Sequence, residues 1–272
     1  MRAKVKKGKY GFYDRQGNMV VPCIYDEANN FKEGLACVCR DGKYGYIDEK
    51  GKEIIPLKYF CASDFSEGMA SVYDGGLYAF IDENGNEIIP PLYDHADDFS
   101  DGLVLVHRDF IPRYIDKTVN TAFALPKYTL AGYFKNGIAA IRGQNGYKGF
   151  INKTGKPVTE FVYDAEYGGI FGIGDSLIEV TQNGLYGFID YNGKQMIPCL
   201  YGEISSAGGG EGLLKARKGG TYGVINGQGE IIVPFIYDFL CGFSEELSFA
   251  VKKGKGGFID KKGHKVIDFV YD

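Results

Sequence analysis

The amino-acid sequence predicts an all-β protein built from tandem repeats, and three observations support this fold class. The 272 residues include 40 glycines, 21 tyrosines and 19 phenylalanines but no tryptophan. Aromatic residues favour the pleated surface of sheets, and glycine supplies the conformations of tight turns. One phrase of residues returns at intervals of about 34 positions. Within this phrase apolar and polar residues alternate, as in a strand, and no segment fits the period of a helix.

The repeated phrase begins with a Tyr-Gly pair. Successive copies are separated by 34, 34, 34, 36, 38, 36 and 34 residues, so the chain holds eight repeats. The pairs are Tyr10-Gly11, Tyr44-Gly45, Tyr78-Ala79, Tyr186-Gly187 and Tyr222-Gly223, with weaker versions at Pro112-Arg113, Lys148-Gly149 and Gly256-Gly257.

Each Tyr-Gly pair is followed by two apolar residues, an Asp or Asn, and a glycine three positions later, as in Tyr46-Ile47-Asp48 and Gly51. A second apolar run such as Glu53-Ile54-Ile55-Pro56 comes next. This order of strand, glycine turn and strand predicts a hairpin. Because the Asp or Asn occurs once per repeat in front of a turn, we expect it to cap the turn amides.

A third short strand precedes the hairpin, so each repeat predicts a three-stranded antiparallel meander followed by an irregular or weakly extended arm. In the middle strand, period two places Tyr44 and Tyr46 on one face and Gly45 with Ile47 on the other. Glycine at position 45 allows a neighbouring element to approach closely. A sheet this small cannot bury its apolar face alone, so we expect the Tyr of each pair to be largely buried between stacked repeats.

The phrase Gly-Lys-Tyr-Gly-Tyr-Ile-Asp at residues 42–48, followed by Gly51, Glu53 and Pro56, resembles the WG repeat, also called the KWG repeat, of bacterial proteins. The resemblance extends over nearly the whole chain. The tryptophan that names the family is replaced by Tyr in the clear copies. The family is defined by its repeat and not by a shared chemistry, so the resemblance implies an architecture and no particular activity.

We expect a single repeat array over residues 1–272, with repeat four degenerate and repeat eight incomplete. A period near 34 residues is short for a propeller blade, which usually needs about 40 or more. The prediction is therefore an open β superhelix of stacked meanders, with a closed propeller-like ring as the alternative. The repeats fall near residues 1–34, 35–68, 69–102, 103–137, 138–176, 177–212, 213–246 and 247–272.

The charge of the chain is balanced, with 31 Lys plus Arg against 35 Asp plus Glu. No nucleic-acid partner is expected from this balance. Residues 60–101 contain ten carboxylates and no Lys or Arg, whereas both ends of the chain are basic. The sequence shows neither a signal peptide nor an apolar run of about 18 residues. The six cysteines lack the paired spacing of a disulfide framework. Together these features predict a cytoplasmic protein with reduced thiols and no membrane span.

Repeat four offers the candidate binding surface. It lacks both the Tyr-Gly pair and the turn glycine, and irregular loops on a rigid scaffold often carry function. The candidate residues are His107, Arg108, Asp109 and Arg113. Drift at a tolerated junction is the alternative interpretation.

No catalytic, cofactor-binding or metal-binding residue is predicted. Cys37 and Cys39 lack the further ligands of a zinc site, and the three histidines are scattered in the sequence. There is no phosphate-binding loop and no nucleophile elbow. The sequence therefore favours a non-enzymatic scaffold for a protein or peptide partner, because repeat arrays present long surfaces and sheet edges. Binding of cell-wall glycan or other carbohydrate by exposed tyrosines is the alternative, and an enzyme with an unrecognised site comes third.

Overall fold

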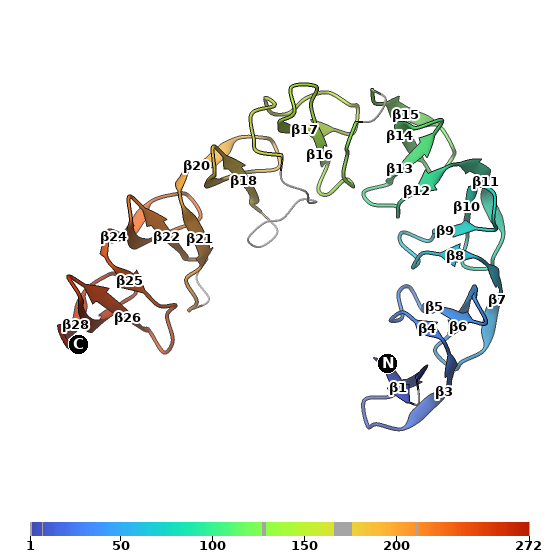
Figure 1. The fold of residues 1–272 in the computed structure, drawn as a ribbon, viewed down its shortest axis with the longest axis horizontal. Helices are drawn as coiled ribbons and strands as arrows, with labels where there is room; N and C mark the ends of the chain where they lie inside the picture. The colour runs from blue at the N-terminus through green and yellow to red at the C-terminus, as the bar shows by residue number, and fades with distance from the viewer. Residues whose placement is uncertain (1, 7, 127–128, 166–175, 210–211, 272) are drawn as a thin grey trace. The chain divides into compact units, whose positions relative to one another are not determined.

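The computed structural model describes residues 2–6, 8–126, 129–165, 176–209 and 212–271. These residues form β-strands, turns and loops, and none of them lies in a helix. The strands make a series of small antiparallel sheets (Figure 1). The all-β fold class is thereby confirmed.

The chain divides into two compact lobes. The first contains Met1–Ile141 and Asn152–Lys156, and the second contains Arg142–Ile151 and Pro157–Asp272. The strands up to repeat four are β1 (Arg2–Lys6), β2 (Lys9–Tyr13), β3 (Met19–Tyr25), β4 (Glu27–Ala28), β5 (Leu35–Arg40), β6 (Lys43–Asp48), β7 (Glu53–Tyr59), β8 (Cys61–Ala62), β9 (Ala70–Tyr73), β10 (Tyr78–Ile81), β11 (Glu87–Tyr93), β12 (His95–Ala96), β13 (Leu103–Arg108), β14 (Ile111–Asp116) and β15 (Thr121–Ala124).

The remaining strands follow the same order. They are β16 (Ile138–Arg142), β17 (Lys148–Asn152), β18 (Ile178–Gln182), β19 (Leu185–Ile189), β20 (Gln195–Tyr201), β21 (Glu203–Ser206), β22 (Leu214–Lys218), β23 (Thr221–Ile225), β24 (Ile231–Tyr237), β25 (Phe239–Leu240), β26 (Leu247–Lys252), β27 (Lys255–Asp260) and β28 (Lys265–Tyr271).

The predicted three-stranded meander is present, but most sheets also have a fourth strand. In the sheet ordered β4-β5-β6-β7, the two-residue strand β4 comes from the start of the preceding arm. Glu27 and Ala28 pair there with Cys39 and Val38 of β5. The arm is thus not wholly irregular. Because the outer strand is so short, four strands fit into about 34 residues, and the repeat length does not argue against a propeller blade.

The glycine of the Tyr-Gly pair allows the third strand to cross close to the second. A Cβ added at Gly45 would lie 2.6 Å from the carbonyl oxygen of Ile55 in β7. The pairing of β6 with β7 shifts register at this point, between Tyr44 and Tyr46. The close approach predicted at Gly45 is confirmed, and the element that approaches is the third strand of the same sheet.

The hydrophobic core lies between consecutive repeats. Phe12, Val21 and Tyr25 of repeat one pack against a covering set from repeat two, which consists of Ala36, Val38 and Ile47. The same contact recurs between repeats two and three, where Ile55 and Tyr59 meet Ala70, Val72 and Ile81. In these pairs each sheet buries the third strand of the sheet before it.

The tyrosines of the Tyr-Gly pairs are partly buried, and none of them is fully buried. Four of the five pack against the cores between repeats, where the sequence predicts them. Tyr44 lies near the edge of its sheet, where its hydroxyl donates a hydrogen bond of 2.7 Å to Oε2 of Glu27. The tyrosines that fill the core are those that end the third strands, such as Tyr25, Tyr59 and Tyr93, with at most 7% of their surface exposed.

Repeat four keeps its sheet although its sequence departs from the repeat. Strands β13 and β14 pair over six residue pairs, from Leu103 with Asp116 to Arg108 with Ile111. Arg113 occupies the position of the glycine, and the third strand β15 has only four residues. A long side chain where glycine normally admits the third strand accounts for this shortening.

The recurring Asp and Asn residues cap turns, as the sequence predicts. Oδ1 of Asp48 accepts hydrogen bonds from the backbone N–H groups of Lys50 (2.9 Å) and Lys52 (2.8 Å). Asn226 accepts the same two bonds from Gln228 and Glu230, both at 3.0 Å. Since Asn serves as well as Asp, the position requires a side-chain oxygen and not a charge.

Candidate functional site

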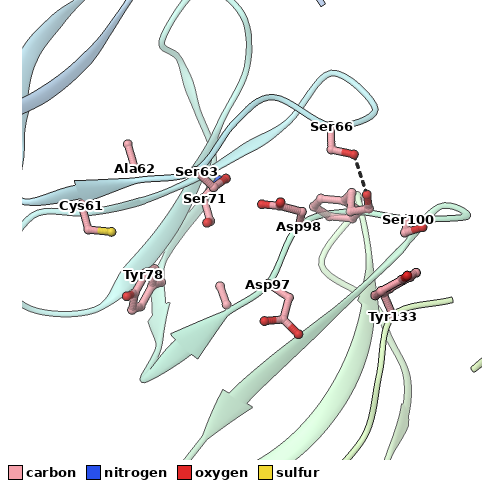
Figure 2. Close-up of a pocket in the computed structure, with 12 residues that line it drawn as sticks. Cys61, Ala62, Ser63, Ser66, Ser71, Tyr78, Asp97, Asp98, Ser100 and Tyr133 are labelled. Atoms are coloured by element: carbon pink, nitrogen blue, oxygen red, sulfur yellow. Dashed lines mark hydrogen bonds between the residues drawn. The ribbon is translucent and has the colours of Figure 1, made fainter. Parts of the chain in front are cut away.

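A groove of about 670 Å³ lies in the first lobe beside the arms of repeats two to four (Figure 2). Its walls come from β8, β9, β10 and β12, from the loops that follow β8 and β12, and from the segment between β15 and β16. The lining residues are Cys61, Ala62, Ser63, Ser66, Ser71, Tyr78, Ala96, Asp97, Asp98, Phe99, Ser100 and Tyr133.

Serine side chains hold successive arms together along this groove. Oγ of Ser66 donates a hydrogen bond of 2.8 Å to the carbonyl oxygen of Phe99 in the next arm. Oγ of Ser100 donates one of 2.6 Å to the carbonyl oxygen of Phe134 in the arm after that. Ser63 Oγ accepts a hydrogen bond of 3.1 Å from the backbone N–H of Ser71. The walls of the groove are therefore fixed by bonds between repeats.

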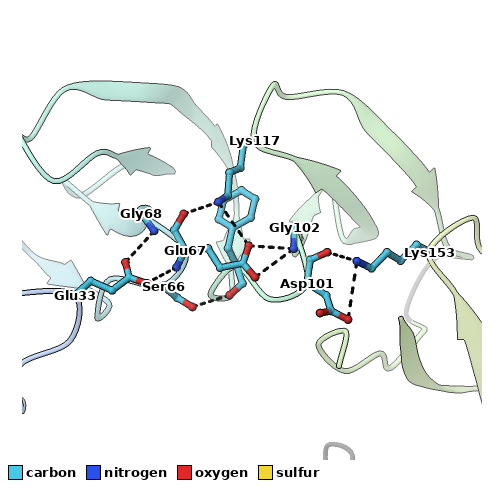
Figure 3. Close-up of polar contacts among 9 residues, drawn as sticks. Glu33, Ser66, Glu67, Gly68, Asp101, Gly102, Lys117 and Lys153 are labelled. Carbon is cyan, nitrogen blue, oxygen red and sulfur yellow. Dashed lines mark hydrogen bonds and ion pairs between the residues drawn. The ribbon is translucent and has the colours of Figure 1, made fainter. Parts of the chain in front are cut away.

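A ladder of carboxylates supports the same loops (Figure 3). The Glu33 carboxylate accepts hydrogen bonds of 2.8 Å from the backbone N–H groups of both Glu67 and Gly68. Glu67 in turn accepts one of 3.0 Å from the N–H of Gly102. Each of these turns has positive φ values, 55° at Glu67 and 78° at Gly102. A carboxylate from the preceding repeat thus caps each turn.

Lysines from the following hairpins complete the ladder. Lys117 donates to the carbonyl oxygen of Glu67, and its Nζ lies 3.6 Å from the carboxylate of that residue. Lys153 makes the equivalent contacts with Asp101, at 3.9 Å from the carboxylate. Figure 3 shows both lysines on the far side of the turns from Glu33. The carboxylates of the ladder are therefore bound to backbone amides and lysines of neighbouring repeats, and these contacts stabilise the scaffold.

The carboxylates inside the groove are less well compensated. Asp97 accepts a hydrogen bond or ion pair of 3.0 Å from Nε2 of His95. Asp98 makes no ion pair with any described residue, and no Lys or Arg lines the groove. Desolvation raises the pKa of Asp98, and the nearby charges of Asp64 and Asp97 raise it further, against the lowering effect of Ser63 and Lys32. Asp98 is therefore compensated only in part, by Ser63 and by the charge of Lys32.

Aromatic rings stand on both sides of these carboxylates. Figure 2 shows Asp97 and Asp98 between Tyr78 on one side and Tyr133 on the other. Tyr78 packs against Tyr73 with ring centroids 5.0 Å apart and against the edge of His95 at 5.9 Å. Tyr133 is 44% exposed, so its ring is open to a ligand. Ring faces beside carboxylates attract cations.

The four residues predicted as a binding surface do not form one surface. His107 and Arg108 end strand β13, and the backbone N–H of Asp109 donates to the Asp94 carboxylate at 2.6 Å in the following turn. Arg113 pairs with Val106 in the hairpin, whereas His107 pairs with Pro112. Neighbouring residues of a strand face opposite sides, so His107 and Arg113 point away from each other.

His107 and Arg113 still carry an unusual feature. Nδ1 of His107 and Nε of Arg113 are the buried side-chain atoms among the described residues that have no hydrogen-bond partner. Burial and the neighbouring His95 lower the pKa of His107. The rings of His107 and His95 lie 5.5 Å apart, and His95 holds Asp97. His107 is therefore connected to the groove through His95 and Asp97, without lining it.

Sequence reasoning did not identify Tyr78, Asp97, Asp98 or Tyr133 as a group. The signal in the sequence was the run of ten carboxylates without Lys or Arg at residues 60–101. Most of these carboxylates lie on turns, where they are solvated or bonded to backbone amides. Asp97 and Asp98, which line the groove, lie instead on the arm that follows β12.

The thiols offer no further site. None of the six cysteines, all of which are described, forms a disulfide, and burial raises the pKa of Cys37 to about 12. Across the described parts of the chain, no three His, Cys, Asp or Glu side chains are grouped as a metal site would require. Nor does any described segment form a helix able to span a membrane.

A comparison with protein families finds a repeat with the same period as the strands. The model of the WG containing repeat matches residues 10–44, 44–78, 78–107, 149–186, 186–222, 222–255 and 257–272. The chain belongs to the WG repeat family. The matches leave out residues 108–148, which include the Pro112-Arg113 pair, although this WG repeat protein forms a sheet of strands β12 to β15 there.

The likeness to solved structures concerns the fold alone. A eukaryotic initiation factor has a TM-score of 0.53 and 10% identity, covering 97% of this chain and 83% of that chain. The computationally designed Ika8 protein has a TM-score of 0.43 and 15% identity, covering 87% and 84%. BamB from Moraxella catarrhalis has 0.43 and 12%, covering 92% and 93%. No curated protein matches the sequence.

Proposed function

We propose that this WG repeat protein is a non-enzymatic scaffold that binds an extended peptide segment of a partner protein through the groove of the first lobe. The observation that supports the proposal is the Asp98 carboxylate, which makes no ion pair with a described residue and lies between the rings of Tyr78 and Tyr133 (Figure 2). Binding sites are typically concave, with apolar walls and a few convergent polar groups. The groove has this composition.

The expected anchor of the peptide is a lysine or arginine side chain. Such a cation would neutralise Asp98, and the faces of Tyr78 and Tyr133 would add a cation–π contribution of about 0.5–2 kcal/mol. Serine hydroxyls along the walls can bond the peptide backbone. Main-chain bonding with side-chain pockets is a common mode of peptide recognition.

A peptide library tests this proposal. Fluorescently labelled extended peptides with one Lys or Arg are screened by anisotropy, and the best binder is compared with versions that carry norleucine or citrulline instead. We expect the neutral versions and Asp98→Asn each to weaken binding by about tenfold or more, since a charge-assisted bond is worth about 1.5–3 kcal/mol. Asp74→Asn, on an exposed hairpin outside the groove, is the matched control.

Two results would contradict the proposal. Equal affinity for charged and neutral peptides would show that no cation is recognised. Unchanged affinity in Asp98→Asn would show that the peptide binds elsewhere on the scaffold.

The affinity should also depend on pH. A cation binds only the ionised carboxylate, and burial raises the pKa of Asp98. As the pH falls, binding should therefore weaken at a higher pH than for an ordinary aspartate of pKa about 3.9. A titration of affinity against pH, repeated with Asp98→Asn, isolates this group.

Carbohydrate remains the second candidate because the tyrosines of the Tyr-Gly pairs keep part of their surface exposed. The hydroxyls of Tyr44 and Tyr222 are already bonded to Glu27 and Glu203, which leaves ring faces but not hydroxyls for a sugar. Cell-wall glycan fragments belong in the same screen. Binding that is lost in Tyr44→Ala and Tyr222→Ala and kept in Asp98→Asn would favour carbohydrate.

A further inference from the structure

One position in the arms carries lysine in repeat one and serine in repeats two and three. Lys32, Ser66 and Ser100 are equivalent, because each makes a β-bridge to the residue three places later, across the arm turn. Ser66 and Ser100 donate their hydroxyls to a backbone carbonyl of the next arm. Lys32 has a longer side chain and reaches a carboxylate of the next arm instead.

That carboxylate belongs to Asp64. Nζ of Lys32 lies 3.3 Å from Oδ2 of Asp64. Nδ2 of Asn29 donates a hydrogen bond of 2.9 Å to the other oxygen, Oδ1. Both oxygens of Asp64 therefore have a partner from the preceding arm, and one of these partners is a lysine.

The same arrangement recurs one repeat later without the lysine. Asp98 is equivalent to Asp64, since each directly precedes the buried phenylalanine of its arm. Ser63 is equivalent to Asn29, since the backbone N–H of each bonds to the first strand of the following hairpin. Ser63 makes a side-chain hydrogen bond with Asp98. At the position of Lys32, however, stands Ser66.

The groove lies where that lysine is missing. Ser66 and Asp98 both line the groove, and Figure 2 shows Ser66 bonded to the arm that carries Asp98. Asp98 makes no ion pair with a described residue. The charge of Lys32 extends this far, because it lowers the pKa of Asp98. Lys32 therefore also opposes the entry of a second cation.

We propose that the serine at position 66 determines the specificity of the groove: it leaves open on Asp98 the place that Lys32 fills on Asp64, and a lysine side chain of the bound peptide fills it. This inference rests on the proposed function and narrows the anchor from a basic residue to lysine. Lys32 makes a single contact to a carboxylate that already has another partner. An ammonium suits such a contact, whereas the guanidinium fork pairs best with two free oxygens.

Ser66→Lys tests the inference, because it supplies the missing lysine from within the chain. Its control is Ser66→Gln, which loses the same hydroxyl and has a long side chain without charge. The probes are fluorescein-labelled nonapeptides of serine and glycine with a central lysine, arginine or norleucine, and anisotropy measures their binding. The lysine peptide should bind Ser66→Lys about tenfold or more weaker than wild type, the loss of a charge-assisted bond. Ser66→Gln should stay within about threefold of wild type.

A titration of the Asp98 carboxyl carbon by nuclear magnetic resonance needs no peptide. Ser66→Lys should lower the pKa of Asp98, because a neighbouring cation favours the ionised form, and Ser66→Gln should not. Lys32→Gln should raise that pKa and tighten the binding of the lysine peptide by about twofold. Lys52→Gln removes an exposed lysine outside the groove and should change neither quantity.

The outcomes separate this inference from the proposed function. Suppose that the lysine peptide binds wild type through Asp98. Equal binding to Ser66→Lys, equal loss in Ser66→Gln, equal affinity for the arginine peptide, or an Asp98 pKa that Ser66→Lys leaves unchanged would then each overturn the inference alone. If neither basic peptide binds wild type, the proposed function is wrong and the inference falls with it. If circular dichroism shows Ser66→Lys unfolded, Lys32→Gln decides, and an unchanged affinity and pKa there overturn the inference.

Discussion

At the scale of single residues, most of the recurring polar side chains serve turns. Asp14, Asp82 and Asp116 accept backbone hydrogen bonds within their own turns. Hydrogen bonds from Asn18 lower the pKa of Asp14, and those from Asn86 lower that of Asp82. A carboxylate that recurs in front of the hairpin turn therefore reports on turn geometry, whereas Asp98 lies on an arm, outside these turns.

The Asp48 turn gives a prediction with an internal control. Asp48→Ala removes the acceptor of two backbone N–H groups, and we expect a loss of about 1 kcal/mol in the free energy of unfolding. Asp48→Asn keeps the acceptor and copies the natural Asn152 and Asn226, so its stability should stay within about 0.5 kcal/mol of wild type. Urea unfolding measures both variants. Equal losses would mean that the charge, and not the hydrogen bonds, stabilises the turn.

At the scale of elements, the third strand is the unit that joins one repeat to the next. Its inward position is nearly inaccessible in the five repeats that have a seven-residue third strand and are followed by another repeat, as at Ile55, which is 1% exposed. The equivalent Ile267 is exposed although its strand pairs with β27 in the same way, from Phe258 with Ile267. Burial at this position therefore comes from the next repeat and not from the strand's own sheet.

This difference predicts unequal costs for the same substitution. Ile55→Ala should lower the free energy of unfolding by about 2–5 kcal/mol, because it removes buried methyl groups and leaves a cavity between repeats. Ile267→Ala should cost clearly less, about 1 kcal/mol, because 38% of the surface of Ile267 is already in water. Thermal and urea unfolding of both variants measure the ratio. Similar costs would show that the third strand is stabilised mainly within its own sheet.

Sequence periodicity was sufficient to predict the sheets but not the contacts that depend on neighbours. The hairpin, the capped turn and the close approach at Gly45 depend only on residues within one repeat. All three are present in the structure. The fourth strand was missed because Glu27 and Ala28 are extended only through pairing with the next sheet. The groove was missed for the same reason, since its residues come from separate arms that only the stacking of repeats brings together.

At the scale of the whole molecule, repetition of one contact explains why a chain of such small sheets can fold. Each sheet has too few residues for a core of its own, and stability arises as a sum of nearest-neighbour contacts. The Glu33 and Glu67 ladder adds polar contacts with the same period. A binding surface on such an array is assembled from several repeats, so a change in one repeat can alter it without unfolding the others.

The last prediction concerns whether the array is open or closed, and it rests on the charges of the two ends. A ring would bring repeats one and eight together and place Lys4, Lys6 and Lys7 near Lys252, Lys253 and Lys255. Like charges at such a seam repel, and the long run of carboxylates without Lys or Arg, residues 60–101, lies at the end of repeat two and in repeat three. We therefore predict an open array. Small-angle scattering should give a radius of gyration clearly above the ~18.5 Å expected for a compact chain of this length. A radius at that limit, with a central hole in the envelope, would show a closed ring, and it would mean that contacts across the seam outweigh the repulsion between its lysines.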